Sequence, residues 1–157
     1  DQQLADYNSI YKVNPPLRTE SDRKALIKAV ADGTVDCIAS HHSPQQWDDK
    51  QVEFEYAENG MLTLQTMLPM LLQLSAEIPL ERWIELLTQK PREIFGLQQT
   101  NIESGSEACL TIFSPVATWK YDEASNQSLS QNSPLFRQTL TGKILGVINN
   151  NQYRIYE

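Results

Sequence analysis

The sequence predicts an α/β fold in which helices and strands are unevenly distributed along the chain. Residues 19–32 show the apolar spacing of an amphipathic helix, and residues 35–40 form a short apolar run typical of a strand buried on both faces. After residue 96 the pattern changes, because strand-like runs alternate with Gly, Pro and Asn turn signals. This order predicts helices around one parallel-type strand first and an antiparallel sheet last.

Length and charge exclude several classes of protein. The chain has 157 residues, enough for one ordinary domain with its own core. Its net charge of −7 argues against nucleic acid or an anionic membrane surface as a partner. We find no apolar run long enough to span a membrane and no signal-peptide pattern, so we expect no membrane association and a cytoplasmic location. Cys37 and Cys109 lie in apolar runs, which predicts two buried, reduced thiols.

The helix over residues 19–32 has clear signals at both ends. Thr19 is placed to cap its start, and Asp22 stands where the acid of a capping box belongs. Gly33 suits the left-handed position that follows many helices. We therefore expect a well-defined helix that leads directly into the strand at 35–40.

Further elements follow from apolar patterns and turn residues. We expect a helix that begins at Gly60 and is kinked or divided at Pro69, then a helix that begins at Pro79 and a short one over 91–95. The Asn-rich residues 149–151 indicate a tight turn, since Asn tolerates positive φ. The strands expected in the last third of the chain cover residues 108–113, 117–121, 142–149 and 152–156.

Both histidines of the chain directly follow the predicted strand at 35–40. Pro44 prevents that strand from continuing, so His41 and His42 lie at its carboxyl end. Parallel barrels place their chemistry at this end of their strands, which makes the two histidines candidate site residues. For His42, a structural residue held by hydrogen bonds is the favoured alternative to a metal ligand. The polar residues 43–58 that follow predict either a binding loop or a solvated connection.

Several motifs, in the right order, resemble the C-terminal part of a dihydroorotase, a family of the amidohydrolase superfamily. The resemblance covers nearly the whole chain. The matching segments are Lys12-Val13-Asn14-Pro15-Pro16-Leu17-Arg18, Asp32-Gly33-Thr34-Val35-Asp36, Glu53-Phe54-Glu55-Tyr56-Ala57 with Gly60 and Leu64, Gln89-Lys90-Pro91-Arg92-Glu93-Ile94-Phe95-Gly96-Leu97 and Gly105-Ser106-Glu107-Ala108-Cys109-Leu110-Thr111-Ile112-Phe113.

The resemblance implies a fold that these residues do not complete. Residues 1–98 would form the C-terminal segment of a (β/α)8 TIM-like amidohydrolase barrel, namely its last strand and flanking helices. Residues 99–157 would form part of a small composite β-sandwich domain. An upstream barrel segment with most of the metal ligands is missing, so we expect the chain to be a fragment of a longer polypeptide.

The resemblance also implies an activity, the reversible hydrolysis of dihydroorotate to carbamoyl aspartate in de novo pyrimidine biosynthesis. In the intact family enzyme, zinc polarises the carbonyl and activates a bound water. We expect no zinc on this chain alone, because a catalytic zinc site takes at least three protein ligands.

The family motif T-D-H-x-P-H corresponds to Ser40-His41-His42-Ser43-Pro44-Gln45 in this chain. His41 stands at the position of the catalytic, metal-binding aspartate, and Gln45 at that of a substrate-contacting histidine. An imidazole can bind zinc, so metal binding at His41 is not excluded, whereas a carboxylate proton shuttle is excluded at this position. The resemblance further assigns substrate contacts to Asn14 and to backbone groups at Asn59 and Gly60.

Three interpretations of function stay open. The first is an active dihydroorotase in which His41 replaces the acid. The second is a catalytically silent scaffold subunit that associates with aspartate carbamoyltransferase. A homodimer is a further possible assembly of the intact protein. The third is another cyclic amidohydrolase, such as a hydantoinase or allantoinase, against which the Asn14-Pro15-Pro16-Leu17-Arg18 match argues.

Overall fold

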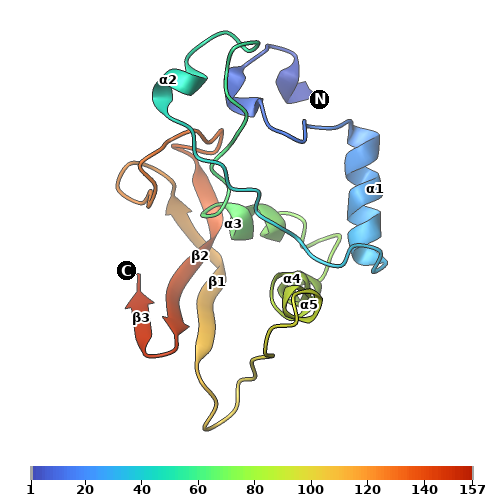
Figure 1. Ribbon diagram of the computed structural model, residues 1–157, viewed down its shortest axis with the longest axis vertical. Helices are drawn as coiled ribbons and strands as arrows, with labels where there is room; N and C mark the ends of the chain where they lie inside the picture. The colour runs from blue at the N-terminus through green and yellow to red at the C-terminus, as the bar shows by residue number, and fades with distance from the viewer. Residues whose placement is uncertain (1, 157) are drawn as a thin grey trace.

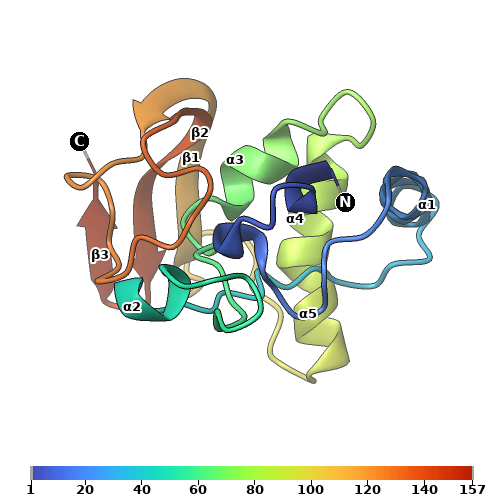
Figure 2. The same cartoon turned by 90° about the horizontal axis from the view of Figure 1, so that it is seen from above.

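The computed structural model describes residues 2–156, which form a helical part beside a three-stranded sheet (Figure 1). Seen from above, α3 lies between the sheet and α4, and α1 stands at the far side (Figure 2). The elements are the 3-10 helices η1 (Gln2–Leu4) and η2 (Ser9–Tyr11), the helices α1 (Glu20–Ala31), α2 (Trp47–Lys50), α3 (Met67–Leu72), α4 (Leu80–Leu87) and α5 (Gln89–Ile94), and the strands β1 (Cys109–Lys120), β2 (Thr139–Asn149) and β3 (Gln152–Ile155).

Helix α1 confirms the predicted capping signals. The Thr19 hydroxyl accepts a hydrogen bond from the Asp22 amide at 3.3 Å, and the Asp22 carboxylate accepts one from the Thr19 amide at 3.1 Å. Gly33 follows the helix with φ of +89°, a conformation that L side chains rarely adopt. The chain therefore turns at Gly33 and runs back along α4.

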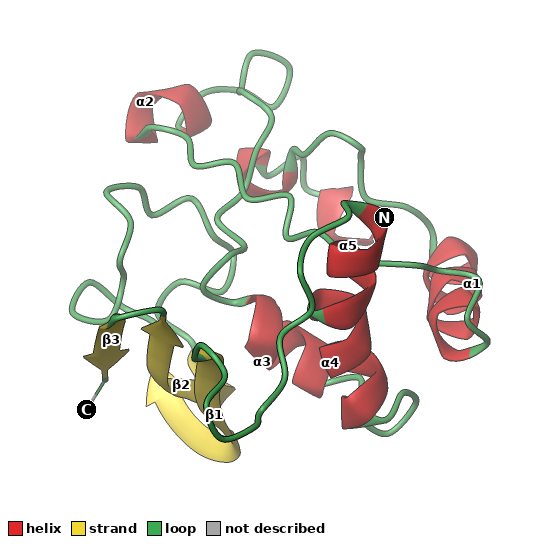
Figure 3. Ribbon diagram, turned by 60° about the horizontal axis from the view of Figure 1, so that its bottom comes forward, coloured by secondary structure: helices red, strands yellow, loops and turns green. Residues whose placement is uncertain are grey.

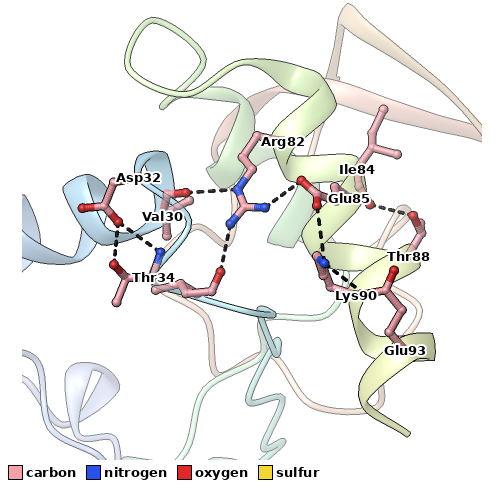
Figure 4. A network of polar contacts seen from close by, with 10 residues as sticks. Val30, Asp32, Thr34, Arg82, Ile84, Glu85, Thr88, Lys90 and Glu93 are labelled. Carbon is pink, nitrogen blue, oxygen red and sulfur yellow. Dashed lines mark hydrogen bonds and ion pairs between the residues drawn. The ribbon is translucent and has the colours of Figure 1, made fainter. Parts of the chain in front are cut away.

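A small apolar core joins α1 to α4. Its buried side chains are Val30, Ile78, Trp83 and Leu86. Arg82 reinforces this contact, because its guanidinium donates to the carbonyl oxygens of Val30 at 3.1 Å and Val35 at 2.9 Å (Figure 4). Together these contacts fix the start of the segment that carries both histidines.

The predicted strand at 35–40 is wrong for this structure. The segment has no regular secondary structure, no described residue pairs with it as a strand, and its backbone contacts are isolated ones such as Ile38 N–H to Leu86 O at 3.4 Å. An apolar run becomes a strand only when a neighbouring strand satisfies its backbone groups. The prediction that both thiols are buried is wrong as well. Cys37 on this segment and Cys109 at the start of β1 are both exposed.

The helix predicted to begin at Gly60 starts seven residues later, at Met67. Gly60 is extended, with φ of +147°, and α3 ends at Leu72. Pro69 is accommodated without a break because it lies in the first turn, where backbone N–H groups have no partner within the helix. The helices predicted at Pro79 and over 91–95 correspond to α4 and α5.

The antiparallel sheet predicted for the last third of the chain is confirmed, with strand order β1-β2-β3 (Figure 3). The two strands predicted at 108–113 and 117–121 are one strand, β1, whose register with β2 shifts between Ser114 and Thr118. Pro115 lies in this irregularity, where a residue without a backbone donor is tolerated. Asn150 has φ of +53° in the turn between β2 and β3. The division into domains at residue 98 stays a prediction.

The sheet meets the helical part where α3 packs against β2. A Cβ added at Gly142 of β2 would lie 2.5 Å from the Leu72 side chain of α3. The carbonyl oxygen of Gly142 accepts a hydrogen bond from the Trp119 indole at 2.8 Å. Within residues 2–156, no helix has the length and apolar character that a membrane crossing requires.

Candidate functional site

A small pocket forms where three segments of the chain meet. Its lining residues are Val13, Asn14, His41, Ser43, Asn59, Gly60 and Met61. Four of the five site residues predicted from the sequence are among them: Asn14, His41, Asn59 and Gly60. Two backbone hydrogen bonds hold the segments together, from Gly60 N–H to Lys12 O and from Ser43 N–H to Met61 O, both at 3.0 Å.

Gly60 is required by the close approach of these segments. A Cβ at this position would lie 2.6 Å from the carbonyl oxygen of Ser43 and 2.7 Å from Nε2 of Gln45. Its φ of +147° is also outside the range that L side chains favour. The pocket wall at 59–61 therefore depends on the absence of a side chain at residue 60.

Gln45 is the one predicted site residue that does not line the pocket. Its Nε2 donates to the carbonyl oxygen of Asn59 at 2.8 Å and contacts the Ser43 hydroxyl at 3.3 Å. The amide thus contacts two residues that line the pocket. Its assignment as a substrate contact stays a prediction, whereas the geometry gives it a structural contact.

His41 is exposed, with φ of +49°, and contributes the only imidazole among the lining residues. The other lining side chains offer amide, hydroxyl, thioether and aliphatic groups. Within residues 2–156, no group of three or more His, Cys, Asp and Glu side chains is gathered as a metal site. The residues present therefore fit a hydrogen-bonding pocket, and they do not by themselves fit the ligand set of a catalytic zinc.

His42 is held by hydrogen bonds to the backbone, as the structural alternative for this residue predicts. Its Nδ1 accepts hydrogen bonds from the backbone amides of Thr63 at 3.2 Å and Leu64 at 3.1 Å. An acceptor at Nδ1 requires an imidazole that carries its proton on Nε2. The Thr63 hydroxyl donates to the carbonyl oxygen of Ser40 at 2.6 Å, so the histidine segment is tied to residues 63–64 at two points.

Lys50 is a residue of this region that the sequence did not indicate. Its side chain is 4% exposed, and its ammonium group donates to the carbonyl oxygens of Glu58 at 2.9 Å and Lys12 at 3.2 Å. Burial lowers the pKa of Lys50 from its ordinary value, and the nearby charge of Lys12 lowers it further. Asn132, from the loop between β1 and β2, is the second such residue. Both contact mainly backbone atoms, which leave no pattern in a sequence.

Curated relatives of this chain carry the name dihydroorotase. One from Trichlorobacter lovleyi is 39% identical over 144 residues, which are 90% of this chain and 34% of the relative. One from Aquifex aeolicus is 40% identical over 143 residues, again 90% of this chain and 34% of the relative. The chain belongs to the dihydroorotase family. It spans about a third of the length of these relatives and is a C-terminal portion of a dihydroorotase-family amidohydrolase.

Solved structures show the same fold for this dihydroorotase-family chain. A D-hydantoinase superposes with a TM-score of 0.80 at 23% identity over 95% of this chain and 34% of its own. The L-hydantoinase of Arthrobacter aurescens gives a TM-score of 0.79 at 25% identity, covering 97% of this chain and 37% of its own. The dihydroorotase of Campylobacter jejuni gives 0.65 at 14% identity, covering 87% of this chain and 38% of its own. No protein-family model matches the chain. The fold is thus the C-terminal piece of the amidohydrolase barrel followed by part of its β domain.

Proposed function

We propose that this chain forms one wall of a site for dihydroorotate and carbamoyl aspartate within a longer dihydroorotase-type protein. The observation that carries this proposal is the pocket itself, which gathers Asn14, His41, Asn59 and Gly60 from three separate segments. Asparagine amides both donate and accept hydrogen bonds, and an imidazole adds a further donor or acceptor. These groups are complementary to the ring amides and the carboxylate of dihydroorotate.

The reaction that this family assignment supports is the reversible hydrolysis of a cyclic amide. When bound, zinc would polarise the carbonyl and supply an activated water. Its main ligands would come from parts of the protein outside these residues, with His41 as the one candidate ligand in this chain. The roles of Asn14, Asn59 and Gly60 are to bind and orient the substrate. The two free thiols, Cys37 and Cys109, favour a reducing, cytoplasmic location.

A second candidate function is a catalytically silent scaffold, with aspartate carbamoyltransferase or a second copy of the chain as partner. Two observations favour it. His41 provides no carboxylate to shuttle a proton, and the Gln45 amide is engaged by the carbonyl oxygen of Asn59 at 2.8 Å. Both positions are those at which the family motif places functional groups.

A hydantoinase or allantoinase is supported less well. The likeness to the D-hydantoinase is a likeness of fold at 23% identity, whereas the relatives at 39% and 40% identity are dihydroorotases. Hydantoin offered as an alternative substrate distinguishes these activities directly.

The experiment uses the full-length polypeptide that contains this chain. Zinc per chain and dihydroorotate hydrolysis are measured for the wild type, His41→Ala and His41→Asp. An active enzyme with His41 as ligand loses zinc and turnover together in His41→Ala, by about 10- to 100-fold or more. A wild type with neither zinc nor turnover, unchanged by both substitutions, contradicts the active enzyme and leaves the scaffold.

A further inference from the structure

The side chain of Asn132 contacts two residues that line the pocket, although Asn132 is not a lining residue itself. It is 7% exposed, and its amide nitrogen lies 3.4 Å from the carbonyl oxygen of Ser43 and 3.3 Å from that of Gly60. Both of these residues line the pocket, and they come from different segments. One amide group therefore bridges two walls that are also joined by the Gln45 side chain and by backbone hydrogen bonds.

The remaining polar atoms of Asn132 extend the same connection. Its Oδ1 accepts a hydrogen bond from the backbone N–H of Gln45 at 3.2 Å, and its backbone oxygen accepts one from the backbone N–H of Leu62 at 3.0 Å. The Ser130 hydroxyl lies within hydrogen-bond distance of Asn132 Oδ1, at 2.6 Å, and of the Gln45 carbonyl oxygen. Each pocket wall is thus held both by the side chain of Asn132 and by an adjacent contact.

These contacts require an amide. The carbonyl oxygens of Ser43 and Gly60 need donors, whereas the backbone N–H of Gln45 needs an acceptor. A primary amide provides both from one side chain. A carboxylate at this position would turn an oxygen toward two carbonyl oxygens, and an alanine would leave buried groups without partners. The identity of residue 132 is therefore specified by its surroundings.

We propose that Asn132 is a positioning residue, which fixes the 43–45 and 60–62 walls relative to each other and couples them to the loop 121–138. The coupling means that the loop between β1 and β2 belongs functionally to the pocket, although its sequence is a polar Ser/Asn/Gln-rich stretch. The proposal concerns geometry and holds whichever reaction the pocket serves. Only its ligand measurement rests on the proposed function.

Asn126 provides a matched control in the same loop. Its amide nitrogen donates to the carbonyl oxygens of Ser128 at 3.0 Å and Ser130 at 2.8 Å, and its Oδ1 accepts from the Ser128 amide at 3.1 Å. These contacts stay within the loop. Replacing Asn126 therefore loosens the loop without removing a direct contact to the pocket walls.

The test is hydrogen–deuterium exchange on the full-length protein for the wild type, Asn132→Asp, Asn132→Ser and Asn126→Ser. We expect peptides that cover 43–45 and 60–64 to exchange at least about tenfold faster in the Asn132 variants, because buried groups lose their partners. Asn126→Ser should accelerate exchange in the loop 121–138 with little change in the two walls. Asn132→Ser, which keeps one donor, carries the test if Asn132→Asp does not fold.

A second measurement separates positioning from general destabilisation. Dihydroorotate affinity is determined by calorimetry at a temperature where all variants are folded. Weaker binding by about tenfold in Asn132→Ser, with unchanged binding in Asn126→Ser, supports the proposal. If the peptides of both walls show wild-type exchange rates in both Asn132 variants, the positioning role of Asn132 is overturned. This holds even if the protein binds dihydroorotate. If exchange in the wall peptides is faster in the Asn132 variants but the protein binds no dihydroorotate, the positioning role is supported. The proposed function is then contradicted instead.

Discussion

The ammonium group of Lys50 lies 3.2 Å from the carbonyl oxygen of Lys12, and the same oxygen accepts the Gly60 amide at 3.0 Å. One backbone oxygen therefore joins the loop that carries Asn14 to the wall that carries Asn59. A buried lysine is stable only when its donors are satisfied, and Lys50 satisfies a second one at the Glu58 carbonyl oxygen. The segments that line the pocket thus depend on a charged group that is not itself a lining residue.

Replacing Lys50 by Met should lower the free energy of unfolding by about 1–3 kcal/mol. Methionine keeps the apolar stem and removes the donors, so the Glu58 carbonyl oxygen loses the ammonium donor and the Lys12 carbonyl oxygen keeps only the Gly60 amide. Urea unfolding followed by circular dichroism measures the change. Lys24→Met is the control, because the Lys24 side chain is 71% exposed and its loss should cost about 0.5 kcal/mol or less. Equal effects of the two substitutions would contradict the role of Lys50.

The contribution of Lys50 to the free energy of unfolding should change with pH in the alkaline range. Burial lowers the pKa of Lys50 in the folded state, so the unfolded chain binds more protons between that lowered pKa and the ordinary value of 10.5. The free energy of unfolding therefore gains a term that rises with pH in this window. The difference between wild type and Lys50→Met should grow as pH approaches 10.5 from below. A difference that is constant or shrinks would show that the pKa is not lowered.

Gly60→Ala should destabilise the protein more than Gly33→Ala. Both glycines have positive φ, +147° and +89°, so both substitutions strain the backbone. A Cβ at Gly60 also meets the Ser43 carbonyl oxygen at 2.6 Å, whereas a Cβ at Gly33 meets nothing within 4 Å. We expect about 1–2 kcal/mol for Gly33→Ala and clearly more for Gly60→Ala, measured by thermal unfolding. The reverse order would show that residues 43 and 60 are not in close contact.

His42 should be replaceable by Asn but not by Gln. The contact that matters is Nδ1, which accepts from the Thr63 and Leu64 amides, and Oδ1 of Asn occupies a similar position on a shorter side chain. We expect His42→Ala and His42→Gln to lower the free energy of unfolding by about 0.5–1.5 kcal/mol and His42→Asn to recover most of it. Denaturant titration of the three variants measures this series. A metal ligand at Nε2 would instead favour Gln over Asn, with the loss visible in zinc content.

The sequence predicted best those features that depend on neighbouring residues. The capping box of Thr19 and Asp22 and the turn at Gly33 are local and were found. The strand at 35–40 was wrong because strand formation depends on a partner strand, which an apolar run does not reveal. The four pocket residues were found through family motifs. Lys50 and Asn132 were missed because they contact backbone atoms of distant segments, and such contacts leave no signature in residue types.

Binding of dihydroorotate to the full-length protein tests the central claim most directly. Isothermal titration calorimetry compares the wild type with Asn14→Ala, which removes a pocket side chain, and with Asn101→Ala, which alters an exposed residue away from the pocket. We expect saturable binding to the wild type and to Asn101→Ala, and an affinity about tenfold lower for Asn14→Ala, since a lost hydrogen bond costs on the order of 1 kcal/mol or more. Absence of binding to the wild type, or equal binding by Asn14→Ala, would contradict the assignment of this pocket as a dihydroorotate site.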